Sequence, residues 1–523
     1  MHNKFLQKNL NSSVRLLRLS AVLLIIAAST LYSINVRGAT GSFAFTNYEL
    51  GTTPGTTCHN ALANCYNFAA EPAIRADNSG NFYASSENGL TGGTVAWKST
   101  DAGLHYITLQ SPNSASAGSM QFSPAGGDTD LAVASLLNGN GLYNVYVASL
   151  ALTNVYVSTS TDGGSTWLLN PTGASVPGDD RPWIAAEGTG KVCVSYHSIT
   201  ATNDIFVTCS TDAGTTFAQT GNAFDPNHLW LASFQNEIGN LAIDPNSHNI
   251  YQSLSGIASA SETTCLNCSL HAVWLAVSTD GGLTFTDHAV YVNPDTSVFY
   301  GHQFVNVSVD QAGNIYVVFS DDHNLYYSFS TDHGTTWSAP SQINQTPSST
   351  AIMPWSVAGG AGKLDVVWYG TSYYHAGTSP DNYPSSAAWY VFFAQNLQAT
   401  TPGSQFSQTT ATPIVHYGGV CESGVTCSGN RDLYDDFGVA ASPTTGLASI
   451  IYSDDQYSTT PTQPAGPGCT SSRSNTSSYP NRPTNSPRGR EPLGPPFSWK
   501  RIRESGSLHR NQTIIHGLAS RCC

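Results

Sequence analysis

Charged residues are scarce in this sequence of 523 residues: Asp, Glu, Lys and Arg together make up only 10% of it. Helix start and stop signals are few as well. Segments rich in Val, Ile, Tyr, Phe and Trp recur instead between clusters of turn residues, and such segments are typical of β-strands. The sequence therefore predicts an all-β protein.

An apolar run near the N-terminus is too short for a membrane span. It covers residues 19–34 and follows Lys4, Lys8, Arg15 and Arg18, whereas a transmembrane helix needs about 20 apolar residues. A basic segment followed by a short apolar stretch is typical of an export signal. We expect a signal peptide at residues 1–38 and a secreted or extracytoplasmic protein. A retained N-terminal anchor is the alternative, and it is the one membrane contact that we expect.

Basic residues are rare outside the C-terminal end. Residues 469–523 contain nine Lys or Arg residues and two acidic ones, which leaves 11 basic and 32 acidic residues for the rest. We expect no nucleic-acid binding, because this part of the chain is strongly acidic. The strand pattern stops after Tyr452, where Pro, Ser and Arg take over. We therefore expect residues 461–523 to form a disordered basic tail, and we favour a shifted reading frame or a truncation as its origin over a native tail.

Eight of the 11 cysteines lie in close pairs. Cys193 and Cys209 fall on neighbouring predicted strands, where a hairpin would place them opposite each other. No second pair with zinc-site spacing accompanies Cys265 and Cys268, so a local disulfide is expected there and not a metal site. Disulfides agree with export. The candidate disulfide residues are Cys58, Cys65, Cys193, Cys209, Cys265, Cys268, Cys421 and Cys427.

An eight-residue phrase with the pattern S-T-D-x-G-x-x-aromatic occurs five times, with its aspartates 50 to 68 residues apart. Such a period indicates a repeat architecture. The Asp accepts backbone hydrogen bonds in an Asx-type turn, the Gly supplies a positive φ, and the aromatic residue packs beneath the turn. The aspartates are Asp101, Asp162, Asp212, Asp280 and Asp332.

This phrase resembles the Asp-box, or BNR repeat, of sialidase-like β-propellers, and the resemblance covers residues 70–455. In that family the box forms the hairpin between the third and fourth strands of a blade, on the face opposite the active site. The resemblance implies that the five aspartates are structural. It also predicts one large propeller domain at residues 39–460.

A second repeat runs in phase with the first and consists of a strand, a polar turn with glycine and a second strand. Its seven copies predict seven four-stranded blades, five of them with intact Asp-boxes; a six-bladed ring, usual for sialidases, is the alternative. The sixth box is degraded at residues 394–406, and the seventh copy lacks outer strands, which residues 41–50 would supply. Acids in the turns, such as Asp77, Asp244 and Asp310, are expected to be turn formers.

The axial face of such a ring is the expected binding site. The loops that precede each first strand, and those that join second to third strands, gather there. Two of them, at residues 254–271 and 371–389, are long, and long loops on a regular scaffold usually carry function. Tyr and Trp rings suit the C–H faces of sugars. The residues expected on this face are Asp180, Trp183, His302, Trp355, Tyr373, His375 and Asp435.

Arginine is nearly absent from the predicted propeller. By resemblance, a sialidase needs an arginine triad for the substrate carboxylate, a Tyr–Glu nucleophile pair and an Asp acid/base; guanidinium groups pair bidentately with carboxylates. Residues 39–468 contain only Arg75, Arg181 and Arg431, and the stretch 70–72, which matches the family's Arg-Ile-Pro motif, lacks its arginine. We therefore expect an incomplete triad. The catalytic candidates are Arg181, Arg431, Glu237, Tyr374 and Tyr434, with either tyrosine as the partner of Glu237.

No metal or other cofactor is expected. Ca²⁺ is the alternative, at the acid pairs that end two second strands, Asp321 with Asp322 and Asp454 with Asp455. The sequence thus predicts an exported propeller that binds a glycan or an extracellular protein without sialidase catalysis. A sialidase or related glycoside hydrolase with an unorthodox arginine set is the alternative, so the enzymatic status stays open.

Overall fold

The structure is a computed structural model. It describes residues 43–51, 70–88, 93–113 and 125–456, except for gaps at 153, 175, 177, 200–202, 233–234, 266–267, 302–303 and 428, together with the backbone of 513–521. The predicted signal segment, the pair Cys58/Cys65 and His302 lie outside the described residues. Within them the protein is an all-β propeller of four-stranded blades, as predicted.

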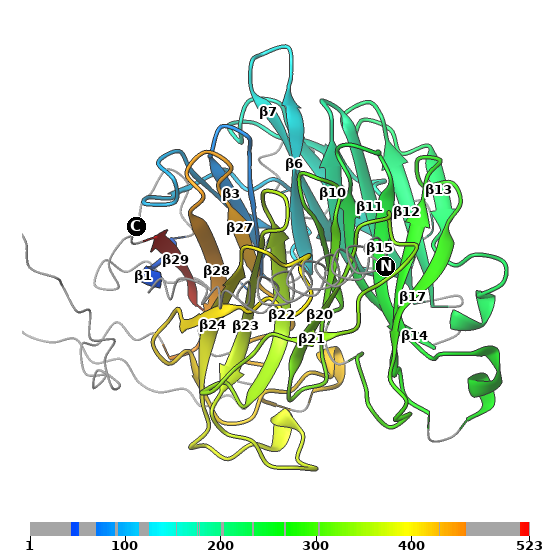
Figure 1. The fold of residues 1–523 in the computed structure, drawn as a ribbon. Coiled ribbons are helices and arrows are strands. Elements are labelled where there is room, and N and C mark those ends of the chain that lie inside the picture. The colour runs from blue at the N-terminus through cyan, green and yellow to red at the C-terminus, as the bar shows by residue number, and fades with distance from the viewer. Residues whose placement is uncertain are drawn as a thin grey trace, which may run out of the picture.

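Six blades are each formed by consecutive antiparallel strands, with the first strand of each on the inside of the ring (Figure 1). The first three comprise β2 (Ala70–Ala76) to β5 (Ile107–Thr108), β6 (Thr129–Leu137) to β9 (Leu168–Asn170), and β10 (Asp179–Glu187) to β13 (Gln219–Asn222). The next three comprise β14 (Asn236–Ile243) to β17 (Thr286–Val292), β18 (Asn306–Val309) to β21 (Ser341–Gln342), and β22 (Thr350–Ala358) to β25 (Ser407–Thr410), where β26 (His416–Tyr417) also pairs with β24 (Ala388–Asn396).

The remaining sheet is made from the two ends of the chain. It has the order β1 (Phe43–Glu49), β29 (Thr513–Arg521), β28 (Ala448–Asp454) and β27 (Gly438–Ala441). In Figure 1 β27 and β28 lie between the first and sixth blades, and β27 contacts both β2 and β22. The prediction of seven blades is therefore wrong and the six-bladed alternative is confirmed: six blades are built from consecutive strands, and the last repeat copy contributes only β27 and β28 to the remaining sheet.

Of the two outer strands of this sheet, β1 comes from the predicted segment and β29 from a segment that was not predicted to form a strand. Residues 41–50 were expected to close the ring, and β1 does join the sheet. The strand β29 pairs with both β1 and β28, although it lies in the segment predicted to be a disordered tail. The rest of that tail is outside the described residues.

The five copies of the phrase form the predicted turns between third and fourth strands. In the copy between β8 (Val155–Ser160) and β9, the Asp162 carboxylate accepts hydrogen bonds from Ser160 Oγ and from the backbone and side chain of Thr166. Gly164 has φ 92°, and a Cβ there would lie 2.6 Å from Leu109 of the preceding blade. The turn therefore requires glycine for its conformation and for the close packing of blades.

The second repeat forms the two innermost strands of every sheet, as its strand–turn–strand pattern predicted. In the first blade, Asp77 Oδ1 accepts hydrogen bonds from the backbone N–H groups of Ser79 and Asn81. Asp310 makes the same contacts with Ala312 and Asn314. The acids of these turns are therefore turn formers.

Disulfides form at the three predicted cysteine pairs that the structure describes. Cys193 of β11 (Lys191–Ser198) lies opposite Cys209 of β12 (Asp204–Ser210), with 4.1 Å between their Cα atoms. The other two join Cys265 to Cys268 and Cys421 to Cys427. Oxidised cysteines indicate an oxidising compartment.

The centre of the ring holds a stack of cationic and aromatic side chains. The Arg181 guanidinium lies 4.6 Å from the Phe304 ring, Phe304 contacts Trp183, and the rings of Trp183 and Trp355 are 5.3 Å apart. The Arg75 guanidinium lies over Trp355 at 5.2 Å. Arg75 and Trp355 also line a cavity of about 560 Å³ at the far ends of the innermost strands. The stack thus runs from Arg181 to two of the residues that line this cavity.

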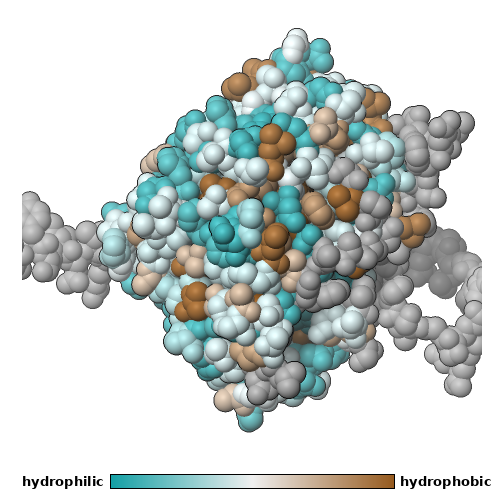
Figure 2. Space-filling view, turned by 90° about the vertical axis from the view of Figure 1, so that its right-hand side faces the viewer, coloured by the Kyte–Doolittle hydropathy of each residue, from teal (hydrophilic) through white to brown (hydrophobic). Residues whose placement is uncertain are grey.

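Large hydrophobic side chains do not gather into one patch on the face in Figure 2, where they occur singly among hydrophilic residues. Such scattering is normal for a folded protein surface. Among the described residues, no helix has the length and apolar character that crossing a membrane requires.

Candidate functional site

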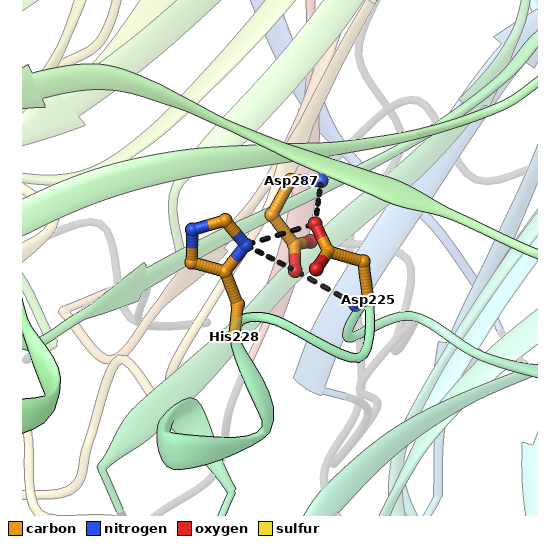
Figure 3. A group of neighbouring side chains, drawn as sticks. All are labelled: Asp225, His228 and Asp287. Carbon is orange, nitrogen blue, oxygen red and sulfur yellow. Dashed lines mark hydrogen bonds and ion pairs between the residues drawn. The ribbon is translucent and has the colours of Figure 1, made fainter.

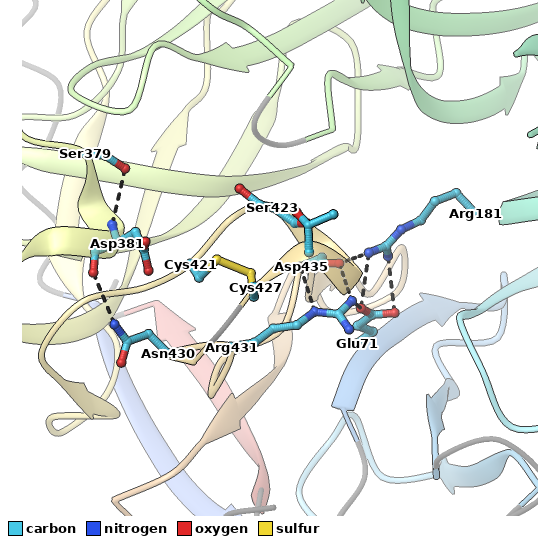
Figure 4. The surroundings of a disulfide bond; sticks show 11 residues. Glu71, Arg181, Ser379, Asp381, Cys421, Ser423, Cys427, Asn430, Arg431 and Asp435 are labelled. Atoms are coloured by element: carbon cyan, nitrogen blue, oxygen red, sulfur yellow. Dashed lines mark hydrogen bonds and ion pairs between the residues drawn. A yellow bond between two sulfur atoms is a disulfide. The ribbon is translucent and has the colours of Figure 1, made fainter. Parts of the chain in front are cut away.

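The innermost strands of three blades carry a β-bulge near their beginning. In each bulge a residue with positive φ precedes a proline: Glu71 at 47°, Arg181 at 52° and Met353 at 52°. A non-glycine residue in this region costs about 1–3 kcal/mol, and such strain concentrates at functional sites. The bulges of β2 and β10 bring Glu71 and Arg181 together across the ring (Figure 4).

Arg181 is the centre of an ion cluster drawn from four parts of the chain. Its Nη1 lies 3.2 Å from Glu71 Oε2 and its Nε lies 3.4 Å from Asp128 Oδ2. Its Nη2 donates a hydrogen bond to Asp435 Oδ2. The side chain of Arg181 is 10% exposed and that of Glu71 is 1% exposed, so these charges interact with little screening by water.

Arg431 approaches the same two carboxylates from the loop before β27. Its Nη2 lies 2.6 Å from Asp435 Oδ2 and 3.4 Å from Glu71 Oε1. Its guanidinium lies over the ring of Tyr434 at 4.8 Å. The disulfide between Cys421 and Cys427 lies in the same loop (Figure 4). Glu71 and Asp435 are thus each shared by two guanidinium groups.

Carboxyl groups outnumber guanidinium groups around this cluster. Burial raises the pKa of Glu71 to about 7, although Arg181 opposes the shift. Burial, reinforced by the charges of Glu71 and Asp128, raises the pKa of Glu87 well above its ordinary value. Burial also raises the pKa of Asp436. Part of the excess negative charge is therefore removed by protonation near neutral pH.

The axial cluster, by which we mean Glu71, Asp128, Arg181, Arg431 and Asp435, combines two chemical abilities. Ionised carboxylates accept hydrogen bonds from the hydroxyl groups of a ligand. A buried carboxyl group that holds its proton near pH 7, such as Glu71, can donate one. The guanidinium groups are already paired with carboxylates of the protein.

The structure brings the catalytic candidates Arg181 and Arg431 together with Asp435, which was expected on the axial face, and places Asp180 beside them. The Asp180 carboxylate accepts a hydrogen bond from the Arg181 backbone N–H, and burial raises its pKa. Tyr434 contacts Arg431 through its ring. Burial raises the pKa of the Tyr434 hydroxyl, and the negative charges of nearby Glu87 and Glu71 raise it further.

Trp183 and Trp355 are not exposed for stacking on sugars. They are 3% and 4% exposed and belong to the central aromatic stack. Each follows the proline of a bulge, where the pairing register shifts. The expectation that they line the binding face is therefore corrected, because the bulge turns both rings into the core.

The long loop at residues 372–387 presents the expected Tyr373, Tyr374 and His375 separately from the axial cluster. Tyr373 packs against Tyr383, with 4.7 Å between ring centroids. Tyr374 is 46% exposed and stacks on His323 at 3.8 Å. His375 is exposed, and its Nδ1 hydrogen-bonds to Thr378.

Glu237 is half-buried, and desolvation raises its pKa to about 7 while Arg181 opposes the shift. The groups that influence its pKa are Arg181, Asp180 and its neighbouring backbone, and they include neither candidate tyrosine. Of the two candidate tyrosines, Tyr434 is the one whose hydroxyl pKa is raised by nearby glutamates, and those glutamates are Glu87 and Glu71.

Arg75 does not join the other arginines. Its Nη2 forms an ion pair with Asp130 Oδ1 at 2.9 Å, below the bulge of β2. The acid pairs that were weighed for Ca²⁺ serve other contacts: Asp321 caps the turn at His323 and Asn324, and Asp455 pairs with His416 at 2.9 Å.

Sequence reasoning missed Glu71, Glu87, Asp128 and Asp436. Glu71 was passed over because the stretch 70–72 was read for a missing arginine. One signal could have found it: in the repeat copies that begin blades one, three and six, the residue before proline is Glu71, Arg181 and Met353. Because Glu71 and Arg181 occupy equivalent positions in their repeat copies, a sequence comparison of the copies would have placed both near the axis, where their opposite charges can pair.

No protein-family model matches this chain, and no curated protein sequence matches it. Solved structures do match, at low similarity. A GH93 alpha-L-arabinofuranosidase of Fusarium graminearum is 14% identical, with 79% of this chain and 93% of that chain covered and a TM-score of 0.40. The Hadza microbial sialidase Hz136 is 12% identical over 57% and 63% of the two chains, with a TM-score of 0.37.

A fucose-binding Aleuria aurantia lectin in complex with alpha-methyl-L-fucoside is 12% identical over 66% of this chain and 96% of that chain, with a TM-score of 0.40. At this level of likeness none of these proteins carries an argument about the chemistry of this chain. The propeller assignment rests on the sheets described above.

Proposed function

We propose that this protein is an exported Asp-box propeller of the sialidase-like type that binds uncharged glycans on its axial face. The five turns between third and fourth strands support the Asp-box assignment. The three disulfides support export. An extracellular protein ligand is the alternative occupant of the same face.

The observation that carries this proposal is the sharing of Glu71 and Asp435 by both Arg181 and Arg431. A guanidinium group that already pairs with a buried carboxylate has few donors left for the carboxylate of an acidic sugar. The surrounding acids add repulsion, since Asp128 and Asp180 also lie at the cluster. An uncharged sugar avoids that repulsion, and its hydroxyl groups donate to carboxylates.

Glycoside hydrolysis is the second candidate function. Burial raises the pKa of Glu71 to about 7, which suits a general acid at neutral pH. Asp435 lies beside it, and its ion pairs with two arginines favour the ionised carboxylate. Glycosidases generally use one protonated and one ionised carboxyl group, and this pair meets that electrostatic requirement.

The test uses the purified full chain on an array of neutral and sialylated glycans. We expect binding to neutral glycans and none to sialylated ones. Arg431→Ala and Glu71→Gln should both weaken binding at least tenfold, whereas Asp162→Ala, in a turn on the opposite face, should not. Selective binding of sialylated glycans would contradict the proposal, and so would unchanged binding by both axial variants.

The same protein is then incubated with fluorogenic glycosides of neutral sugars and of sialic acid. Turnover of a neutral glycoside that Glu71→Gln abolishes would establish hydrolysis. Binding without turnover would leave a lectin-like function. Turnover of the sialoside that Arg431→Ala abolishes would instead establish a sialidase.

A further inference from the structure

A second group of ionisable side chains lies at the joint between the third and fourth blades, away from the axial cluster. It consists of Asp225, in the segment after β13, of His228, and of Asp287 on β17, the outer strand of the fourth blade. One oxygen or nitrogen of each residue lies within 4.8 Å of those of the other two. The carboxylates face each other, and the imidazole points between them (Figure 3).

The two carboxylates are fixed by the backbone of the opposite blade. The Asp225 N–H donates to Asp287 Oδ2 at 2.9 Å, and the Asp287 N–H donates to Asp225 Oδ2 at 3.1 Å. The Asn227 N–H donates to Asp225 Oδ1. The His228 ring packs against Trp230 and Trp274, with centroid distances of 5.5 and 5.2 Å. All three side chains are therefore held in place before any ligand arrives.

One oxygen in this group is buried without a partner. The side chain of Asp287 is 0% exposed, and its Oδ1 accepts no hydrogen bond from any described residue. A buried polar atom without a partner costs about 1–3 kcal/mol. The carboxylate that carries it is turned toward Asp225 and His228 (Figure 3), so a cation bound to this carboxylate through Oδ2 would offset the negative charge that it shares with Oδ1.

We propose that Asp225, His228 and Asp287 bind a divalent transition-metal ion, with Zn²⁺ as the best fit. Two carboxylates and one imidazole are ligands that Zn²⁺ accepts, at about 2.0–2.2 Å each. Two ligands of a tetrahedral ion at that distance lie about 3.4 Å apart. His228 Nδ1 lies 2.8 Å from Asp225 Oδ2 and 3.6 Å from Asp287 Oδ2, so the observed spacings bracket this value.

The charges and the open side of the site agree with such an ion. Two ionised carboxylates and a neutral imidazole carry a net charge of −2, which a divalent cation balances. Ca²⁺ fits less well, because it prefers six to eight oxygen ligands. His228 is partly exposed, so an ion can reach the three residues from solvent. The ion would join the third and fourth blades, so its binding would stabilise the fold.

The competing occupant is a proton. Burial raises the pKa of Asp287 to about 7, and a proton on this carboxyl group would also satisfy the pair. Metal binding requires Nδ1 of His228 to be unprotonated, whereas a proton on Asp287 does not involve His228 as a ligand. Replacing the histidine therefore separates the two explanations.

The experiment uses the full chain without an affinity tag, stripped with a chelator and then dialysed against Zn²⁺ at pH 7.5. We expect one bound Zn²⁺ per chain by mass spectrometry and a rise in Tm of several degrees. His228→Ala should weaken binding at least tenfold and remove the Tm rise. The matched control is His248→Ala, since His248 pairs with one carboxylate only, Glu187 at 2.8 Å, and it should behave as the native chain.

If His228→Ala does not fold, judged by circular dichroism, Asp287→Asn replaces it, because it keeps the side-chain shape while removing an anionic ligand. Loss of Zn²⁺ binding in either variant with retention in the control supports the site. The proposal is overturned if the native chain binds no Zn²⁺ at 10 times the protein concentration, if the variants bind it as tightly as the native chain, or if only Ca²⁺ raises the Tm.

Discussion

Arg181 reaches across the ring to Glu71, 110 residues earlier in the chain, with 3.2 Å between Nη1 and Oε2. Each residue stands in a strained bulge before a proline. Their blades are not neighbours, since the second blade lies between them in the ring. The contact thus joins two non-adjacent blades, and each of its residues also pairs with the loop before β27, Arg181 with Asp435 and Glu71 with Arg431.

Replacing Arg181 with alanine should destabilise the protein by about 3–5 kcal/mol, because Glu71, Asp128 and Asp435 would lose a shared buried counter-charge. Urea unfolding at pH 7.5 measures the change. The control is Lys191→Ala, which removes a partly exposed pair with Glu187 and should cost about 1 kcal/mol or less. Equal losses in both variants would show that Arg181 does not compensate the cluster.

Asp179 should make the protein less stable as the pH rises. Burial raises the pKa of its carboxyl group from 3.8 to about 7. Below pH 3.8 both the folded and the unfolded chain hold the proton. Between pH 3.8 and 7 only the folded chain holds it, so the free energy of unfolding falls with increasing pH, by up to about 1.4 kcal/mol per pH unit, and levels off above pH 7.

Asp179→Asn removes this titration, so the variant should gain stability over the native chain at pH 8 but gain little at pH 4. Urea unfolding at both pH values gives the comparison. The matched control is Asp295→Asn, because Asp295 is exposed and its hydrogen bonds with Ser297 lower its pKa instead of raising it. A gain for Asp179→Asn that is the same at both pH values would contradict the assignment.

The disulfide that encloses the longer stretch of chain should stabilise the fold more, because the loop-closure entropy grows with the logarithm of the loop length. The bond between Cys193 and Cys209 spans 16 residues, and that between Cys265 and Cys268 spans three. Loop-closure entropy predicts losses of about 3 and 1.6 kcal/mol when each pair is replaced by alanine. Thermal unfolding of the two double variants tests the order, and a larger loss for the short loop would refute it.

Contacts set by local pattern were predictable from the sequence. The pairing of Cys193 with Cys209 followed from a hairpin register that continues through Tyr196 and Phe206. The turn around Asp162 followed from the chemistry of its phrase. In both cases the residues that decide the structure lie within about 20 positions of each other.

Contacts set by ring closure were not predictable in this way. Arg431 and Glu71 are 360 residues apart, and no local pattern joins them. The burial of Trp183 depends on a bulge that interrupts the alternation of the strand. The strand β29 lies in a segment without a strand-like surrounding pattern, and its place is set by its partners β1 and β28, which are far apart in the sequence.

The phrase aspartates should matter for stability and not for ligand binding. Asp162→Ala removes the acceptor for Ser160 Oγ, the Thr166 N–H and Thr166 Oγ1. We expect a loss of about 1–2 kcal/mol, since the turn is exposed to water that replaces part of these bonds. Glycan affinity measured on the same sample should be unchanged. A loss of affinity in a folded variant would indicate that the ligand binds the face that carries these turns and not the axial face.

Tyr374 and Trp183 should respond in opposite ways to truncation, because one is 46% exposed and the other 3%. Tyr374→Ala should weaken glycan binding severalfold while leaving the Tm within about two degrees, since the exposed ring contributes little to the core. Trp183→Ala should cost about 3–5 kcal/mol, because it leaves a cavity beside Phe304 and Trp355. Leu168→Ala, an exposed residue that directly follows a phrase turn, should change neither quantity. If Tyr374→Ala binds glycans as the native chain does, the ligand contacts the axial cluster without this loop.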